Sequence, residues 1–220
     1  MTGLTSLDRY RAATAALVDG DAALDGIRFV VLDCETTGLD PATDRIITIG
    51  AVGVVNGEIR LDDTFERLVR IDENTSAVTV HGVTRDESRA GVDEAEALAA
   101  FLDYVGDGII VGHHIGHDIG TLNAGYARHW GTRLVNRDLD TMDLTLLLER
   151  DGAFSGRPAI RHFTLDALCE MFGVVPHDRH TASGDAFITA QVLLRLLKLG
   201  ARCGRTTLGG ISQPFEPAAS

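Results

Sequence analysis

The sequence feature that most constrains the fold is a mainly apolar run, residues 27–32, that contains one charged residue, Arg28, and ends directly at an acidic side chain, Asp33. An apolar, β-branched run of this length is typical of a strand buried on both faces at the centre of a sheet. Alternate residues of a strand point to the same face. We therefore expect Asp33 and Glu35 to project together, with Cys34 pointing the other way.

This pair of acids predicts a cation site. Two carboxylates ~4–6 Å apart repel each other by a few kcal/mol at an effective dielectric near 20, so a fold that holds them together needs a positive partner. Oxygen-only ligands suit Mg²⁺ or Mn²⁺. The alternative is that Asp33 and Glu35 are unrelated acids at a solvated strand end, and the Asp-x-Glu pattern alone leaves both interpretations open.

The remaining pattern indicates a mixed α/β sheet with helices on both sides. A strand over 46–55, the hairpin signal Asn56-Gly57 and a strand in two parts, 58–61 and 65–69, predict an antiparallel meander. Helical and strand patterns then alternate. We expect helices over 4–18, 92–104, 118–130, 144–148, 163–172 and 184–199, and short strands over 108–112 and 139–141.

The chain divides into three segments by composition. Residues 1–26 are expected to form an N-terminal helix and a linker, and residues 27–199 the main domain. From residue 200 on, Gly, Pro, Ser and Thr dominate, so residues 200–220 are expected to be a flexible tail.

Charge and cysteine content narrow the classes of function. The chain has 20 Lys and Arg against 32 Asp and Glu, a net charge of −12, whereas a protein that coats duplex DNA would be basic. No apolar run reaches the ~18–20 residues that span a bilayer, and we find no signal peptide. Three scattered cysteines favour reduced thiols. We therefore expect a cytoplasmic protein without a membrane partner.

Three further residues that could take part in catalysis or metal binding lie at or near the expected starts of helices. Asp118 starts a helix after the strand 108–112, and Asp185 starts the last helix, five residues after His180. Taken singly, the two acids could be helix caps and the histidine an ordinary loop residue. Together with Asp33 and Glu35 they form an ordered set: Asp-x-Glu, Asp, His-x4-Asp.

This ordered set resembles the motifs of the DEDDh 3′–5′ exonucleases, a family that includes the epsilon proofreading subunit of bacterial DNA polymerase III. The segment Asp33-Cys-Glu-Thr-Thr-Gly is similar to the first motif, Val111-Gly-His-His-Ile-Gly-His-Asp118 to the second, and His180-Thr-Ala-Ser-Gly-Asp185 to the third. The resemblance extends over residues 28–199. It implies the ribonuclease-H-like exonuclease fold, with a mixed five-stranded sheet flanked by helices, so that 27–199 would be an exonuclease domain.

The resemblance also implies a role for each residue. Asp33 would bridge two divalent metal ions, Mg²⁺ or Mn²⁺; Glu35 and Asp185 would complete the first site, and Asp118 would hold the second. His180 would be the general base toward the attacking water. Two such ions ~3.5–4 Å apart can clamp both oxygens of an in-line displacement, and a histidine is a suitable base near neutral pH. The product would be a nucleoside 5′-monophosphate.

Further residues are expected to contact the substrate by the same resemblance. Thr36, Thr37 and Leu39 would meet the terminal nucleotide, although Leu39 could equally be an ordinary turn residue. Val80-His81-Gly82-Val83-Thr84 is similar to a loop beside the terminal base, which implicates His81. The same loop could instead be the turn that starts a helix, with Thr84 as the N-cap and Glu87 completing a capping box.

The second motif departs from the family pattern at two positions. His114 replaces an Asn that has a role near the substrate, and His117 replaces a Phe. A rival hypothesis is that His113, His114 and His117 form a transition-metal site with Asp118. That hypothesis leaves the other acids unexplained, and a milder version has His117 tuning the metal preference toward Mn²⁺.

The expected partners are the 3′ ends of single-stranded DNA or RNA, with a replication or repair partner unproven. The net charge of −12 favours short or single-stranded ends over long duplex. Gln213-Pro214-Phe215 has a faint similarity to a sliding-clamp-binding peptide, for which chance is the better explanation. The alternatives are a phosphodiesterase for very short oligonucleotides and a weakly active nucleotide-binding module.

Overall fold

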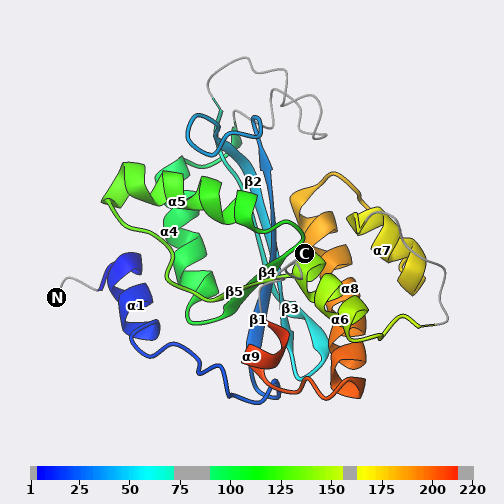
Figure 1. Ribbon diagram of the computed structural model, residues 1–220. Helices are drawn as coiled ribbons and strands as arrows, with labels where there is room; N and C mark the ends of the chain where they lie inside the picture. The colour runs from blue at the N-terminus through cyan, green and yellow to red at the C-terminus, as the bar shows by residue number, and fades with distance from the viewer. Residues whose placement is uncertain (1–3, 72–89, 156–162, 213–220) are drawn as a thin grey trace, which may run out of the picture.

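A five-stranded mixed sheet, in the order β3-β2-β1-β4-β5, lies at the centre of the computed structural model (Figure 1). The strands span Arg28–Thr36 (β1), Ile46–Val55 (β2), Glu58–Leu68 (β3), Ile109–Gly112 (β4) and Asp138–Asp140 (β5). The pairs β1–β2 and β2–β3 are antiparallel, and the pairs β1–β4 and β4–β5 are parallel. The predicted meander followed by parallel strands is confirmed. The structure describes residues 4–71, 90–155 and 163–212.

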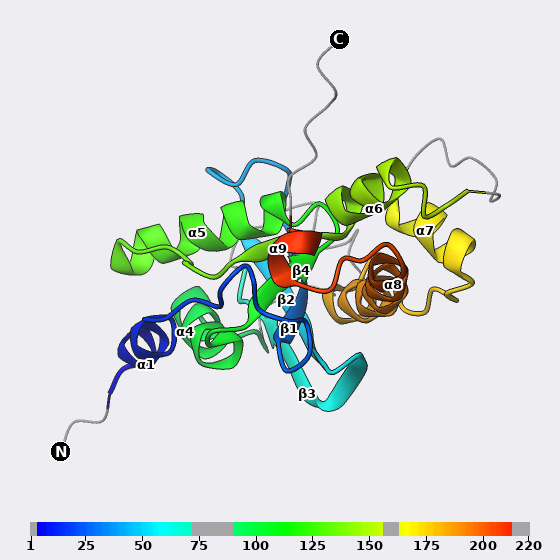
Figure 2. The same cartoon turned by 60° about the horizontal axis from the view of Figure 1, so that its bottom comes forward.

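Helices cover both faces of this sheet. Figures 1 and 2 show α1, α4 and α5 on one side and α6, α7 and α8 on the other. Their bounds are Ser6–Ala13 (α1), Glu94–Val105 (α4), Gly116–Trp130 (α5), Thr141–Arg150 (α6), Leu165–Phe172 (α7), Ala182–Arg202 (α8) and Leu208–Ile211 (α9). No helix within the described ranges is long and apolar enough to cross a membrane.

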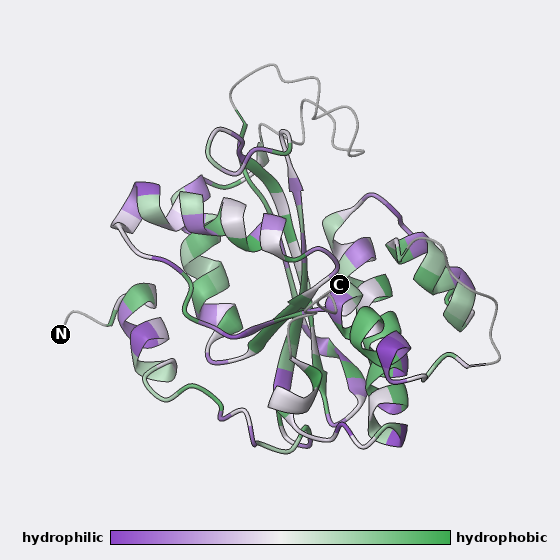
Figure 3. Cartoon of the chain, viewed as in Figure 1, coloured by the Kyte–Doolittle hydropathy of each residue, from purple (hydrophilic) through white to green (hydrophobic). Residues whose placement is uncertain are grey.

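Strand β1 is buried on both faces, as its apolar run predicts. Phe29 and Val31 belong to the core on the side of α6, α7 and α8, whereas Val30 and Leu32 belong to the core on the side of α4 and α5. Figure 3 shows the apolar residues concentrated along the sheet and on the helix faces turned toward it. The same alternation puts Cys34 in the α4–α5 core. Asp33, one residue before it, therefore faces the α8 side.

A glycine on β2 allows α8 to come close to the sheet at this level. Gly50 pairs with Asp33 across the β1–β2 ladder. A Cβ atom at Gly50 would lie 2.4 Å from the carbonyl carbon of Ala182 and 2.4 Å from the nitrogen of Ser183. Only a residue without a side chain leaves room for the first turn of α8 here, and that turn carries Asp185.

The region after residue 199 differs from the expected flexible tail. Helix α8 continues to Arg202, and α9 buries Leu208 and Ile211 in the core on the α8 side. Thr207 caps α9 by accepting a hydrogen bond from the backbone N–H of Gly210 at 3.2 Å. Two buried apolar side chains on one short helix suffice to order this segment, but they give no periodicity that a sequence reading can detect. Residues 213–220, with the segment 213–215, lie outside the described residues.

The segment before β1 also packs onto the sheet rather than forming a free linker. The N–H of Leu24 donates to the carbonyl of Thr206 at 3.2 Å, and the N–H of Leu208 donates to the carbonyl of Ala22 at 2.9 Å. Helix α1 ends at Ala13, earlier than predicted. The residues before β1 and those around α9 thus close the same end of the sheet, the end at which β1 starts.

Replacement of Gly50 by Ala tests the close approach of α8. The added methyl group would overlap the backbone of α8, and overpacking of this kind costs about 1–3 kcal/mol. We expect a lower free energy of unfolding by chemical denaturation. We also expect loss of any function that needs Asp185 beside Asp33, because α8 must move away from β2 to accommodate the methyl group.

Gly116→Ala is the matched control, because a Cβ atom at this helical position meets nothing within 4 Å. This variant is expected to be neutral or to gain up to about 1 kcal/mol. Equal stabilities of the two variants would contradict the role assigned to Gly50.

Candidate metal centre and active site

Three carboxylates meet where β1 ends and α8 begins. Asp33, Glu35 and Asp185 each offer an oxygen atom, and these atoms all lie within 4.8 Å of one another. Asp33 and Glu35 come from alternate positions of β1, and Asp185 from the first turn of α8. The strand alternation and the helix over Gly50 therefore bring together acids that are 150 residues apart in the sequence.

The turn before α8 holds Asp185 in place. Thr181 caps the helix by accepting a hydrogen bond from the N–H of Gly184 at 3.1 Å. Gly184 has no room for a side chain, because a Cβ atom would lie 2.1 Å from the carbonyl oxygen of Asp178. The backbone N–H of His180 donates to Oδ2 of Asp185 at 3.3 Å. The spacing of the third motif is thus set by a tight turn into a capped helix.

Asp118 reaches the same strand from the opposite face of the sheet. It lies in the first turn of α5 and is 7% exposed. Its Oδ1 accepts a hydrogen bond from the backbone N–H of Cys34 at 2.8 Å. Cys34 is the residue between Asp33 and Glu35 in the sequence. Asp118 is not one of the three acids with mutually close ligand atoms.

Burial and repulsion from neighbouring carboxylates raise the pKa values of Asp33 and Asp118. Burial is the largest cause for Asp33, followed by the charges of Asp118, Asp185 and Glu35, and its pKa lies well above the usual range. The pKa of Asp118 rises to about 7, chiefly because of burial, against the lowering effect of its hydrogen bond from Cys34. Without a cation, the site therefore favours protonated carboxyls.

The donor set fits a hard divalent cation. All three close ligands are carboxylates, with no nitrogen or sulfur among them. Carboxylate oxygens are preferred by Mg²⁺ and Mn²⁺, whereas zinc and copper sites draw on histidine and cysteine. A cation of this kind would also remove the repulsion that raises the pKa values of Asp33 and Asp118.

His180 lies at the rim of this acidic cluster. It is exposed, and its φ angle of 64° places its backbone in the left-handed region. Few residues other than glycine adopt this region without cost, and Asn, Asp and His are the most frequent among them. The turn thus brings the backbone of His180 against Asp185 and leaves its imidazole accessible to solvent.

The expected substrate residues of the first motif lie in the turn after β1. The hydroxyl of Thr36 donates to the carbonyl of Gly38 at 2.7 Å, and the hydroxyl of Thr37 donates to Oδ1 of Asp44 at 2.9 Å. Leu39 is 88% exposed, so its side chain is open to solvent. His81 lies outside the described residues.

The histidines of the second motif do not gather into a metal site of their own. Nδ1 of His113 is 3.0 Å from the hydroxyl of Thr141, and burial lowers the pKa of His113 to about 4. Nε2 of His117 is 3.4 Å from the hydroxyl of Thr36. His114 is exposed, with a φ angle of 61°. Within the described residues, the acids Asp33, Glu35 and Asp185 are the group that could hold an ion.

Sequence reasoning missed an aspartate that orders the second motif. One oxygen of Asp140 accepts from the N–H of His114 at 3.1 Å, and the other accepts from the N–H of Ile115 at 3.0 Å. Asp140 also caps α6, so this helix begins at Thr141, earlier than predicted. A residue at the end of a three-residue strand carries little sequence signal, which is why the pattern did not reveal it.

Sequence reasoning also missed a cation beside the acids. Nη1 of Arg179 forms an ion pair with Oδ1 of Asp185, and its Nε donates to Oδ1 of Asp166 on α7 at 2.8 Å. Arg179 partly offsets the rise in the pKa of Asp33. The available signal was its place next to His180, although one arginine in a loop is not distinctive.

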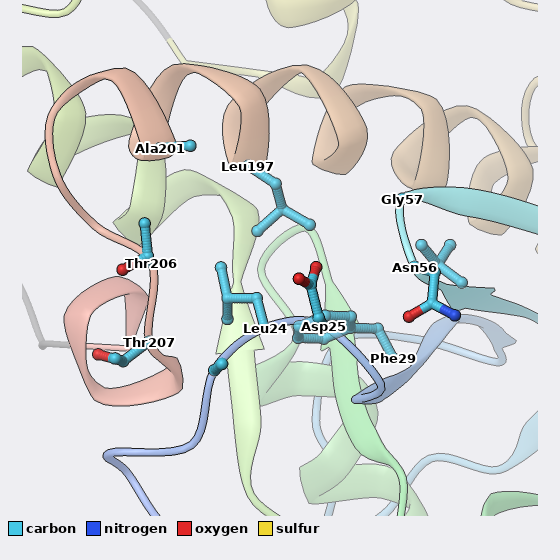
Figure 4. Close-up of a pocket in the computed structure, with 11 residues that line it drawn as sticks. Leu24, Asp25, Phe29, Asn56, Gly57, Leu197, Ala201, Thr206 and Thr207 are labelled. Carbon is cyan, nitrogen blue, oxygen red and sulfur yellow. The ribbon is translucent and has the colours of Figure 1, made fainter.

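A cavity of about 360 Å³ lies at the opposite end of β1 and does not mark this site. Figure 4 shows Leu197 and Ala201 of α8 near Leu24 and Phe29, with Thr206 and Thr207 at one side. Its lining is mostly apolar and contains one carboxylate, Asp25. The titratable groups that could perform chemistry converge at the other end of the strand.

Comparison with known proteins agrees with this geometry. The sequence pattern of the RNase T exonuclease family matches residues 30–193. The chain is 34% identical over 194 residues to "DNA polymerase III PolC-type" of Thermotoga maritima, covering 86% of this chain and 13% of that protein. It is 32% identical over 179 residues to the PolC-type polymerase of Bacillus subtilis, covering 80% and 12%. The chain thus spans about an eighth of the length of these relatives.

Solved structures show the same fold. Escherichia coli exonuclease I in complex with a dT13 oligonucleotide has a TM-score of 0.64 and 21% identity, over 80% of this chain and 42% of that one. The zinc-bound form of the E. coli exonuclease I–single-stranded DNA complex has a TM-score of 0.65 and 21% identity, over 82% and 42%. The fold is therefore the ribonuclease-H-like exonuclease fold, and the chain belongs to the RNase T exonuclease family.

Proposed function

We propose that this protein is a metal-dependent 3′–5′ exonuclease of the DEDDh type, which removes nucleoside 5′-monophosphates from single-stranded ends. The observation that carries the proposal is the convergence of Asp33, Glu35 and Asp185. Asp118 is hydrogen-bonded to the backbone N–H of Cys34, the residue between Asp33 and Glu35. Crowded and shielded acids, of which Asp33 and Asp118 have raised pKa values, are typical of catalytic metal sites rather than of solvated strand ends.

Two divalent ions, Mg²⁺ or Mn²⁺, would be held by Asp33, Glu35, Asp185 and Asp118. When bound, such ions activate a water and stabilise the charge that develops on the phosphoryl oxygens. The chain's own part is to present carboxylates from a rigid strand and two helix starts. Asp118 accepts a hydrogen bond from the N–H of Cys34 through Oδ1 and would hold an ion or an ion-bound water through its other oxygen.

His180 would take the proton from the attacking water. Its imidazole is exposed at the rim, while its backbone N–H holds Asp185 at 3.3 Å. A histidine accepts a proton near neutral pH and can release it to solvent. The left-handed turn at His180 supports this role because it keeps the base near the acids without burying it.

Thr36, Thr37, Leu39 and His114 would contact the terminal nucleotide, and His81 stays a proposal of the same kind. The exposed side chain of Leu39 could pack against a base, and the anchored turn from Thr36 to Asp44 would keep it there. The net charge of −12 supports binding of one end of the nucleic acid through the metal ions, with few contacts from the protein to phosphates farther along the strand.

The setting of this activity is also a proposal, because the chain covers 12–13% of the PolC-type relatives. Their identity supports a role in DNA replication or repair in the cytoplasm, with single-stranded DNA as the preferred substrate over RNA. The exonuclease I complexes with DNA oligonucleotides support the same preference.

A time course on 5′-labelled oligonucleotides tests the function. Single-stranded DNA, RNA and a dinucleotide are incubated with Mg²⁺ or Mn²⁺, and the products are resolved by length. We expect a ladder that shortens one nucleotide at a time from the 3′ end of the DNA. Asp118→Asn is expected to lower the rate about 10³-fold or more, because a metal ligand supplies several kcal/mol of transition-state stabilisation.

Asn is chosen because its amide oxygen keeps the hydrogen bond from Cys34. The variant is therefore expected to stay folded by circular dichroism, and loss of activity then reports the charge. Cleavage of the dinucleotide alone would favour the short-substrate phosphodiesterase. Undiminished cleavage by Asp118→Asn would rule out the proposed metal ligand.

A second prediction concerns the base. His180→Asn is expected to lower kcat by about 10²–10⁴-fold with little change in KM, as removal of a general base does. Asn also adopts the left-handed backbone with little cost, so the loss reports the imidazole rather than the turn. His177→Asn, in the same loop and also exposed, is the matched control and is expected to keep full activity. Equal rates for both variants would exclude His180 as the base.

A third prediction concerns stability against pH. The pKa values of Asp33 and Asp118 are raised in the folded protein, the latter from 3.8 to about 7, so the native state holds protons that the unfolded chain releases. Without bound metal, the protein should therefore lose stability as pH rises from about 4 through about 7. The check is the melting temperature in EDTA at several pH values across this window.

Mn²⁺ is expected to raise the melting temperature more at about pH 8 than at about pH 5.5, because it binds the ionised acids. Asp118→Asn removes one of the titrating groups and should flatten the slope in EDTA. A metal-free stability that rises through this window would contradict the assignment.

A further inference from the structure

One cationic side chain, that of Arg179, lies against the acidic cluster. Nη1 of Arg179 is paired with Oδ1 of Asp185, and the N–H of the next residue, His180, donates to Oδ2 at 3.3 Å. Two consecutive residues of one turn therefore hold both oxygens of the same carboxylate. These two contacts fix the orientation of the Asp185 carboxylate.

The same guanidinium has a second partner outside the cluster. Nε of Arg179 donates to Oδ1 of Asp166 at 2.8 Å. The side chain of Asp166 is 67% exposed, whereas that of Asp185 is 10% exposed and that of Arg179 is 21% exposed. Arg179 thus bridges a shielded acid of the cluster and a solvent-facing acid on α7.

The two pairs differ in what they contribute. An exposed ion pair contributes little stability and is screened by salt, so Asp166 serves chiefly as an anchor. A pair in shielded surroundings acts at a lower effective dielectric, and here it offsets repulsion among three carboxylates within 4.8 Å. A divalent ion bound by those carboxylates would offset the same repulsion with twice the charge, and it would repel the guanidinium.

We propose that Arg179 is a positioning residue that acts through Asp185: its guanidinium offsets the carboxylate charge when no metal ions are bound, and it is displaced toward Asp166 when they bind. The proposal rests on the metal-binding part of the proposed function. By linkage, a group that stabilises the metal-free state and opposes the metal-bound state weakens metal affinity. Arg179 thereby preserves the geometry of the site and sets the metal concentration at which it fills.

The proposal predicts opposite changes in Mn²⁺ affinity for substitutions at Arg179 and at Asp166. Arg179→Gln removes the competing charge, so Mn²⁺ should bind about tenfold more tightly. Asp166→Asn leaves the guanidinium without its second anchor and adds net positive charge near the site, so Mn²⁺ should bind several-fold more weakly. Both affinities are measured by calorimetry with Mn²⁺ alone, in the absence of nucleic acid.

The melting temperature gives a second, independent measurement. In EDTA at about pH 8, Arg179→Gln should melt below the wild type, because the carboxylates lose their counter-ion. In saturating Mn²⁺ the difference should shrink, since the ions then supply the charge. Arg60→Gln is the matched control, because Arg60 pairs with exposed Asp62 on β3 and should change neither the Mn²⁺ affinity nor the gap between the two conditions.

The outcomes separate this proposal from the function on which it rests. If the wild type binds Mn²⁺ and Arg179→Gln binds it equally or less tightly, Arg179 is not a competitor and the proposal is overturned while the metal site stands. If the wild type binds no Mn²⁺, both fail. If Arg179→Gln does not fold, Asp166→Asn decides, and unchanged or tighter Mn²⁺ binding by that variant overturns the proposal.

Discussion

Repulsion among carboxylates at the end of β1 is the constraint around which this protein is arranged. Asp33, Glu35 and Asp185 have oxygen atoms within 4.8 Å of one another, and Asp118 bonds to the strand between the first two. Such a group costs free energy unless a cation is present. The rest of the fold can be understood as the support that holds these acids together despite that cost.

Much of the arrangement of the acids could be predicted from the sequence. The apolar run before Asp33 indicates a strand, and the side chains of a strand alternate between its two faces. A strand buried on both faces leaves Asp33 and Glu35 on one side and Cys34 on the other, and the motif order gave the remaining acids. The roles of His180 and of the substrate residues stay predictions. The side chains of His180, Leu39 and His114 are exposed, whereas Thr36 is buried, and these positions do not test the roles.

What the sequence could not reveal depends on contacts between distant segments. The close approach of α8 at Gly50 and the bridge from Arg179 to Asp166 exist only once the chain has folded. Helix α9 was missed for a related reason, since Leu208 and Ile211 become meaningful only when the residues before β1 pack beside them. A pattern within a short window carries no record of such partners.

The left-handed backbone at His180 restricts which residue types can replace this histidine without strain. Most side chains would strain the turn that leads into α8, but Asn and Gly would not. A single exchange of His for Asn would therefore remove the imidazole while leaving the turn and the neighbouring carboxylates in place. If His180 is the general base that we propose, one substitution separates this protein from a form that keeps the acidic cluster and lacks the base.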